Sequence, residues 1–438
     1  MSAFWIKALQ LFLSLSILIV LHEGGHYVAA RIFKTRVEKF FLFFDVKFAL
    51  FKKKIGDTVY GIGWLPLGGY VKISGMIDES MDTEQMAKPP QPWEFRSKPA
   101  WQRLIIMLGG VTVNLILGFF IFMMIQFYWG KNVVPVDGLP NGFEVSQHMK
   151  DLGFQDGDLI LKVDGEELES QLEISSHIML RNAEIITTKH QNGDIEDISI
   201  PKDYSKTLFA AGEMVPFNPI IPSVIDSVFA DTPAEKAGLK KGDKILEING
   251  QEITQWNELN KIKAESEGST LSLAYLSDGE LKNIELTPDQ NGNIGITPQR
   301  NYKFKHLSYS FGESIGEGFS YTYWTLKDYV AQFKFVFTKK GASQLGGFGT
   351  IGSLFTPVWD WQSFWHTTAF ISIILAFMNI LPIPALDGGH VMFLLYEMIT
   401  GRKPNEKVLE VAQMIGILIL LTLVVYANGN DIYRYFFK

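Results

Sequence analysis

Four apolar stretches, each near the length that crosses a lipid bilayer, constrain this chain most. They cover residues 8–30, 104–129, 363–386 and 411–428. A helix needs about 20 apolar residues to span the hydrocarbon core. We therefore expect a polytopic α-helical membrane protein with four transmembrane helices, held in a lipid bilayer.

The first stretch ends in LHEGGHYVAA, which places His22, Glu23 and His26 in an apolar segment. Ionisable groups at membrane depth are costly and by default mark function. Positions i and i+4 share one face of a helix, so both imidazoles can reach one metal ion. Glu23 lies one step round, where its carboxylate can reach a water on that metal. This motif argues against a cleaved signal peptide, while a polar patch inside a helix bundle remains the alternative.

A catalytic zinc ion takes three protein ligands, and the chain has no cysteine. The third ligand must then be His, Asp or Glu. Asp387, at the end of the third apolar stretch, is the candidate. His22 lies about 21 Å along the first helix, and Asp387 lies at the far end of a stretch that crosses in the same direction. Pro382 and Pro384 should break the helix before Asp387, where irregular backbone would line a wet cavity.

Loop charges predict the orientation of the spans. Residues 31–103 hold 13 Lys+Arg against 8 Asp+Glu, whereas residues 131–360 hold 21 against 33. Because basic loops stay in the cytoplasm, we expect the long acidic region and both termini on the outer side. The formal net charge of −7 gives no indication of nucleic-acid binding.

The acidic region contains a duplication. GFQDGDLILKVDGEEL at 153–168 aligns without gaps to GLKKGDKILEINGQEI at 238–253, and each copy reads as strand, tight turn, strand. Together with DTPAEKAGL at 231–239, these residues resemble bacterial PDZ domains. We expect two PDZ-like α+β domains at 131–215 and 216–300, inserted on the outer side. They would either capture peptide C-termini by strand addition or act as spacers and size filters.

The motifs in the spans carry a more specific resemblance. HExxH in the first span and N-x-x-P-x-P-x-L-D-G at 379–388 resemble the site-2 protease family of intramembrane zinc metalloproteases. The tandem PDZ-like domains make the chain similar to the bacterial regulator-of-sigma-E protease group. The resemblance implies that His22, His26 and Asp387 hold one Zn²⁺ per chain and that Glu23 is the base. It also implies that Asn379 binds substrate or stabilises the oxyanion.

The same resemblance implies a function and a place. The expected activity is hydrolysis of transmembrane segments of single-pass membrane proteins, such as anti-sigma factors or signal-peptide remnants. The expected location is a bacterial inner membrane. A proteolytically silent peptide-binding receptor and a metal-handling membrane protein stay open as alternatives.

Two further motifs match the family less closely. LPLGGYVKISG at 65–75 is similar to the family's membrane-dipping hairpin, and it could offer an edge strand to substrate or be an ordinary cytoplasmic hairpin. The residues concerned are Gly68, Gly69, Tyr70, Val71 and Lys72. The family's Gly-Pro-x-x-Asn in the second span appears as Gly110 and Asn114 without the proline. Phe44-Asp45 replaces the family's Gly-Phe-Gly.

These observations predict five regions. Residues 1–130 hold the first two spans and the hairpin, and residues 131–215 and 216–300 form the PDZ-like domains. Residues 301–361 combine aromatic side chains typical of an interfacial helix with a glycine-rich loop at 341–352, expected beside the substrate entrance. Residues 362–438 form the last two spans.

Overall fold

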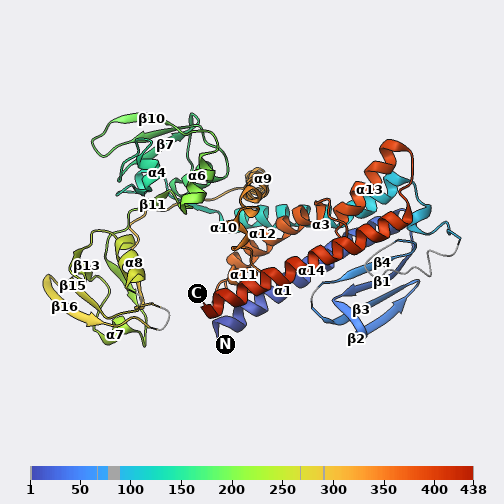
Figure 1. Ribbon diagram of the computed structural model, residues 1–438, viewed down its shortest axis with the longest axis horizontal. Helices are drawn as coiled ribbons and strands as arrows, with labels where there is room; N and C mark the ends of the chain where they lie inside the picture. The colour runs from blue at the N-terminus through green and yellow to red at the C-terminus, as the bar shows by residue number, and fades with distance from the viewer. Residues whose placement is uncertain (1, 67, 77–88, 267, 290–291, 438) are drawn as a thin grey trace. The chain divides into compact units, whose positions relative to one another are not determined.

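The computed structural model describes residues 2–66, 68–76, 89–266, 268–289 and 292–437 (Figure 1). It forms two compact units, one made of residues 1–130 and 308–438 and the other of residues 131–307. We call them the membrane unit and the inserted unit. Leu67, part of the predicted hairpin at 65–75, lies outside the described residues.

The membrane unit contains four helices that are long and apolar enough to cross a membrane. Among the described residues their mean hydropathy ranges from 1.4 to 2.5, which confirms the four predicted spans. They are α1 (Ala3–Ile32), α3 (Ala100–Trp129), α12 (Trp361–Ile380) and α14 (Glu406–Phe437). Both chain ends lie at one end of these helices (Figure 1).

The third span is shorter than its apolar stretch. α12 ends at Ile380, because Pro382 and Pro384 lack the N–H groups that would continue it. The expectation that Asp387 closes this segment was wrong in one respect. Asp387 opens a further helix, α13 (Asp387–Thr400), which the apolar pattern did not indicate.

Glycines let α1 and α3 pack with their backbones in contact. A Cβ atom added to Gly25 would lie 2.3 Å from the carbonyl oxygen of Gly109, and one added to Gly109 would lie 2.6 Å from that of Gly25. Small residues at helix crossings permit such close approach in membrane proteins. The crossing lies within the HEGGH segment and therefore fixes the height of the two histidines against α3.

A four-stranded sheet follows α1. Its strands are β1 (Val37–Leu42), β2 (Phe44–Ile55), β3 (Thr58–Leu65) and β4 (Tyr70–Ile73), in the order β2-β3-β1-β4. β4 pairs antiparallel with β1, with Phe41 opposite Tyr70, and it is an edge strand. Val71 and Ile73 of β4 are buried in one cluster with Ala30 of α1 and Ile106 of α3. The edge strand is thus seated against the membrane helices.

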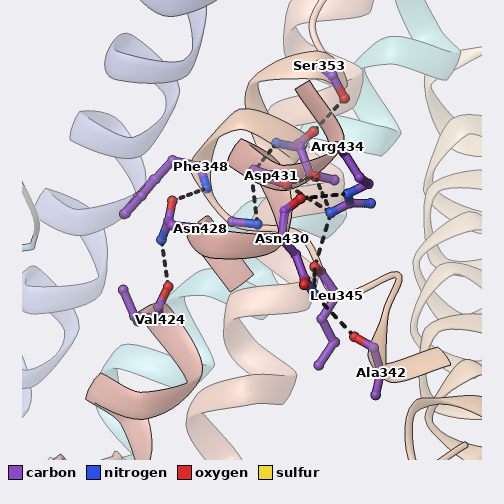
Figure 2. A network of polar contacts seen from close by, with 11 residues as sticks. Ala342, Leu345, Phe348, Ser353, Val424, Asn428, Asn430, Asp431 and Arg434 are labelled. Atoms are coloured by element: carbon purple, nitrogen blue, oxygen red, sulfur yellow. Dashed lines mark hydrogen bonds and ion pairs between the residues drawn. The ribbon is translucent and has the colours of Figure 1, made fainter. Parts of the chain in front are cut away.

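The glycine-rich segment forms short helices that the end of α14 holds in place. α9 (Phe311–Val336) is followed by α10 (Lys339–Ala342) and α11 (Phe348–Ser353). Asp431 accepts hydrogen bonds from the N–H groups of Gly347 and Thr350 at 2.9 and 3.0 Å, and Asn428 accepts one from Phe348 at 3.2 Å (Figure 2). The segment is therefore fastened by side chains some 80 residues later in the sequence.

The inserted unit contains two four-stranded sheets that follow the repeat. The first has the order β10-β9-β7-β8 and the second β14-β13-β15-β16. The strands are β7 (Leu159–Val163), β8 (Glu166–Glu167), β9 (Ile185–Lys189), β10 (Ile195–Ser199), β13 (Lys244–Ile248), β14 (Gln251–Glu252), β15 (Leu271–Ser277) and β16 (Glu280–Leu286).

Shorter elements complete the inserted unit. They are β5 (Lys131–Val133), β6 (Phe143–Val145), α4 (Gln147–Lys150), α5 (Ile174–Met179), α6 (Tyr204–Ala211), β11 (Phe217–Pro219), β12 (Ile225–Val228), α7 (Pro233–Lys236), α8 (Trp256–Glu265), β17 (Ile296–Pro298) and β18 (Lys305–Leu307).

The predicted tight turns have the expected backbone. Asp164 and Gly165 have φ of 51° and 85°, and Asn249 and Gly250 have φ of 50° and 77°. Two consecutive positive φ values are the requirement of the two-residue turn that suits the twist of a β-hairpin. The sequence signal for strand, turn and strand is confirmed in both copies.

Candidate metal centre

The structure brings His22, His26 and Asp387 together. α1 presents the two histidines on one face, and α13 places its first residue opposite them. Oδ2 of Asp387 lies 3.3 Å from Nε2 of each histidine, and the two Nε2 atoms are 3.3 Å apart. Among the described residues, these three form the one group of His, Asp or Glu side chains found close enough together to hold a metal ion.

This triangle has the dimensions of a zinc site. With ligand bonds of about 2.0–2.1 Å, a tetrahedral zinc ion would hold its ligand atoms about 3.3–3.4 Å apart. Oδ2 of Asp387 is buried, with no hydrogen-bond partner in the described part of the chain. Three converging electron-pair donors repel one another unless a cation lies between them, so the donor set fits zinc.

Backbone and amide groups fix the imidazole rings. Nδ1 of His26 lies 2.8 Å from the carbonyl oxygen of Ile106 and must donate to it, which leaves Nε2 unprotonated for a metal. Nδ1 of His22 lies 3.1 Å from the side-chain amide of Asn114. The amide atom that faces the ring is Nδ2, and Oδ1 of Asn114 is buried without a hydrogen-bond partner among the described residues. Turned by 180°, the same amide would accept the Nδ1 proton through Oδ1 and free Nε2 of His22.

The second-span residues therefore lie at the centre, although the family's proline is missing there. Asn114 is fully buried. A Cβ atom added to Gly110 would lie 2.5 Å from both Cε1 of His22 and Nε2 of His26. The role of Gly110 is to leave room for the rings.

Glu23 faces the same cavity from the next position of α1. The cavity measures about 760 Å³ and is lined by His22, Glu23, His26 and Asp387. Asn379, near the end of α12, also lines it, and its side-chain amide nitrogen lies 3.5 Å from Nε2 of His22. A carboxylate, an amide and the three candidate ligands thus line one cavity.

The predicted hairpin residues form another wall of this cavity. Gly68, Gly69, Tyr70, Val71 and Lys72 all line it. Gly69 passes close to α1, since an added Cβ would lie 2.5 Å from Cγ2 of Ile19 and 3.6 Å from Cγ of Glu23. The start of the edge strand β4 is therefore next to Glu23.

An ion pair fixes the helix that supplies Asp387. Arg103 of α3 donates to Glu397 of α13 at 2.5 Å, with side chains 10% and 12% exposed. At the other side, Oε1 of Gln413 on α14 accepts from the N–H of Ala385 at 3.1 Å. α13 and the turn before it are thus held from two neighbouring helices.

Sequence reasoning did not find several cavity residues. Phe348 and Ile351 of α11, Lys39, Asp45 and Gln413 line the cavity. Gln413 was detectable, because it is a polar residue within an apolar span. Asp45 stood out only as part of a departure from a family motif, and Lys39 gave no motif signal.

Comparisons with known proteins agree with this geometry. The chain is 29% identical to the regulator of sigma E protease of Haemophilus influenzae, over 96% of this chain and 97% of that protein. It is 28% identical to the regulator of sigma-E protease RseP of Escherichia coli K12, over 96% and 97%. It is 27% identical to a Neisseria meningitidis protein named as a zinc metalloprotease, over 95% and 97%.

A solved PDZ domain of an SdrC-like protein from Listeria monocytogenes matches 17% of this chain and 84% of its own at 28% identity, with a TM-score of 0.16. The sequence profile of peptidase family M50 matches residues 10–423, which include both the histidine pair and the aspartate that meets it. The chain has four apolar helices and a cluster of two histidines and an aspartate that could hold a metal ion, and with the family match it is a membrane zinc metalloprotease that belongs to peptidase family M50.

Proposed function

We propose that this protein is an intramembrane endopeptidase that cleaves transmembrane segments of single-pass membrane proteins. The observation that carries the proposal is the His22–His26–Asp387 triangle, built from two helices of the membrane unit, α1 and α13, beside one cavity. One Zn²⁺ per chain would be held there. When bound, zinc polarises a carbonyl group and lowers the pKa of water toward 7.

Glu23 is the general base of the proposed reaction. Its carboxylate takes a proton from the attacking water and passes it to the leaving amine. It lies beside the ligands but belongs to none of the three contacts that form the triangle. The side-chain amide of Asn379 donates to the oxyanion or to the substrate backbone.

The edge strand β4 receives the substrate. An amide inside a transmembrane helix is shielded by its own hydrogen bonds, so the helix must be unwound before cleavage. An extended segment can add to a sheet edge through main-chain hydrogen bonds. β4 is such an edge, and Gly68–Lys72 line the cavity that holds the metal ligands.

We also propose a cellular location for the protein and a side of the membrane for its two PDZ-like domains. The protein lies in the inner membrane of a bacterium, with its termini and the PDZ-like domains at 131–215 and 216–300 on the periplasmic side. The substrates are anti-sigma factors or signal-peptide remnants. The PDZ-like domains either bind peptide C-termini or exclude bulky substrates.

Cleavage of a reconstituted single-pass reporter tests the function. We compare the native chain, a Glu23→Gln variant and the native chain with a chelator. Glu410→Gln is the matched control, because Glu410 lies on another membrane helix and does not line the cavity. We expect the native chain and the control to cleave the reporter and the Glu23→Gln variant not to cleave it. The chelator should abolish cleavage by the native chain, and added zinc should restore it.

A Glu23→Gln variant that cleaved at the native rate would contradict the role of Glu23. Zinc bound at one per chain without cleavage of any of several reporters would favour the silent peptide-binding receptor instead.

A further inference from the structure

Asp45 occupies a position where the resemblance leads one to expect glycine. It follows Phe44 at the start of β2, and its side chain lines the cavity that holds the metal ligands. A carboxylate in that wall needs hydrogen-bond or ionic partners, because burying a charged group without partners costs free energy.

The partners of Asp45 form a closed polar triangle. The hydroxyl of Tyr70 donates to Oδ1 of Asp45 at 2.7 Å. Nζ of Lys39 donates to Oδ2 of Asp45 at 3.4 Å and to the Tyr70 hydroxyl at 3.1 Å. All three side chains line the cavity. The phenol oxygen of Tyr70 is thus held by one acceptor and one donor.

The ring of Tyr70 is held as firmly as its hydroxyl. It stacks on Phe41 with ring centroids 5.6 Å apart and on Phe44 at 6.1 Å, with interplanar angles of 18° and 11°. Phe41 is also the residue opposite Tyr70 in the β1–β4 pair. The side chain therefore has little freedom to rotate.

Tyr70 is the first residue of β4, and it directly follows Gly69, which lies against α1. An added Cβ on Gly69 would lie 2.7 Å from the carbonyl oxygen of Phe41 as well as 2.5 Å from Ile19. One added to Gly68 would lie 2.9 Å from the ring of Phe44. A shift of Tyr70 would therefore move the chain beside Glu23.

We propose that Asp45 and Lys39 are positioning residues, which hold the Tyr70 hydroxyl and so fix the start of the edge strand β4 beside Glu23. The inference rests on the proposed function, in which β4 receives the substrate. β4 has four residues and one neighbouring strand, so a side-chain anchor at its first residue sets where an added strand lies. Misplacement of a scissile bond by about 1 Å can cost about 100-fold in rate.

The triangle is poorly suited to a purely stabilising role. The side chains of Lys39 and Asp45 are 40% and 26% exposed, and ion pairs at such sites contribute little to stability. Burial alone would raise the pKa of Asp45, but the Tyr70 hydrogen bond and the Lys39 charge hold it below its usual range. Asp45 is therefore ionised at neutral pH and accepts from both partners.

The test compares Tyr70→Phe, Asp45→Ala, Asp45→Asn and the Tyr70→Phe/Asp45→Ala double variant of the full-length protein. Tyr60→Phe is the matched control, because Tyr60 lies on β3 of the same sheet and does not line the cavity. Its hydroxyl is hydrogen-bonded to that of Tyr27 on α1 at 2.6 Å. Zinc content, kcat, KM and the position of the cut in the reporter, read by mass spectrometry, are measured for each.

We expect unchanged zinc content, a fall in kcat of about tenfold or more that exceeds any change in KM, and cuts at neighbouring bonds. Asp45→Asn, which keeps an oxygen acceptor for Tyr70, should lose less than Asp45→Ala. The double variant should be no worse than the worse single variant, because both remove one interaction.

Native kcat and a native cut position in Tyr70→Phe would overturn the inference. So would a parallel loss of folded protein and zinc in Tyr70→Phe and Asp45→Asn, which would indicate a structural role. Either result leaves the proposed function intact. That function fails only if the native chain does not cleave the reporter or if the Glu23→Gln variant cleaves it.

Discussion

Gly110 and His26 are so close that a Cβ atom on Gly110 would lie 2.5 Å from the Nε2 atom of His26. A methyl group at this position would occupy the space of a metal ligand. Gly110→Ala should therefore displace both imidazoles, lower the zinc content below one per chain and reduce cleavage about 100-fold, as expected for displaced reacting groups. Zinc content by elemental analysis and reporter cleavage measure these effects.

Gly118→Ala is the control for Gly110→Ala. It is the same substitution on α3, but the added methyl would meet the Cδ1 atom of Ile373 at 2.5 Å, the flexible end of a side chain. The control should keep its zinc. Equal zinc loss in both variants would show that the helix crossing, rather than the ligands, is disturbed.

Asn114 should set the zinc affinity through His22. Asn114→Leu removes the hydrogen bond to Nδ1 of His22 at similar volume, and we expect the zinc affinity to fall about 10- to 100-fold, as is usual when a ligand's supporting hydrogen bond is lost. Asn114→Asp keeps an oxygen acceptor and should bind zinc more tightly than Asn114→Leu. A competitive zinc titration against a chelator gives the order, and the reverse order would refute the acceptor role.

The Arg103–Glu397 pair should matter for stability. Both side chains are nearly buried, so Arg103→Met leaves a buried carboxylate unpaired and should cost about 3–5 kcal/mol. The double variant Arg103→Met/Glu397→Leu should recover much of the loss. The melting temperature in detergent measures both effects. Lys241→Met is the control, because the Lys241–Asp226 pair is 72% and 42% exposed and should contribute little to stability.

The fastening of α11 should depend on Asp431. Asp431→Leu removes the acceptor for the N–H groups of Gly347 and Thr350, so amide hydrogen exchange across 345–352 should speed up at least about tenfold. Phe348 and Ile351 line the cavity, and the reporter's KM should therefore change too. Unaltered exchange in this segment would show that the remaining contacts suffice.

Histidine 190 makes the first PDZ-like domain sensitive to pH. A hydrogen bond to Asp158, at 2.7 Å from Nδ1, raises the pKa of His190 above its ordinary 6.5. A raised pKa means that the bond stabilises the fold below pH 6.5 and that this contribution is lost as pH rises through the higher folded value. Hydrogen-exchange protection of β7 and β9 in the full chain, corrected for intrinsic rates, should fall as the pH rises above 6.5. His190→Gln should abolish that dependence.

Local patterns in the sequence were sufficient for much of the structure. Helical spacing put His22 and His26 on one face, and the prolines at 382 and 384 ended α12 at Ile380. The Asp-Gly and Asn-Gly turns are likewise set by two residues each. In each of these cases the residues that determine the local structure lie within a few positions of one another in the sequence.

Contacts between distant segments were beyond such reasoning. The Tyr70–Asp45 bond joins residues 25 apart and the Asn114–His22 contact residues 92 apart, and neither follows from a periodic pattern. α13 was missed because Asp387, two glycines and His390 separate its apolar residues from the third stretch, and the apolar run that remains is too short to suggest a span. These features depend on tertiary packing, which is determined by many segments of the chain together and cannot be read from any one of them.

The two halves of the metal centre also lie far apart in the order of synthesis. His26 and Asp387 are separated by 361 positions in the chain (387 − 26), so a growing polypeptide carries the histidine pair through nearly its whole production without the third ligand. An unfinished chain in the membrane therefore cannot complete the centre. The same separation means that a truncated product that ends before α13 lacks Asp387 and cannot form this triangle.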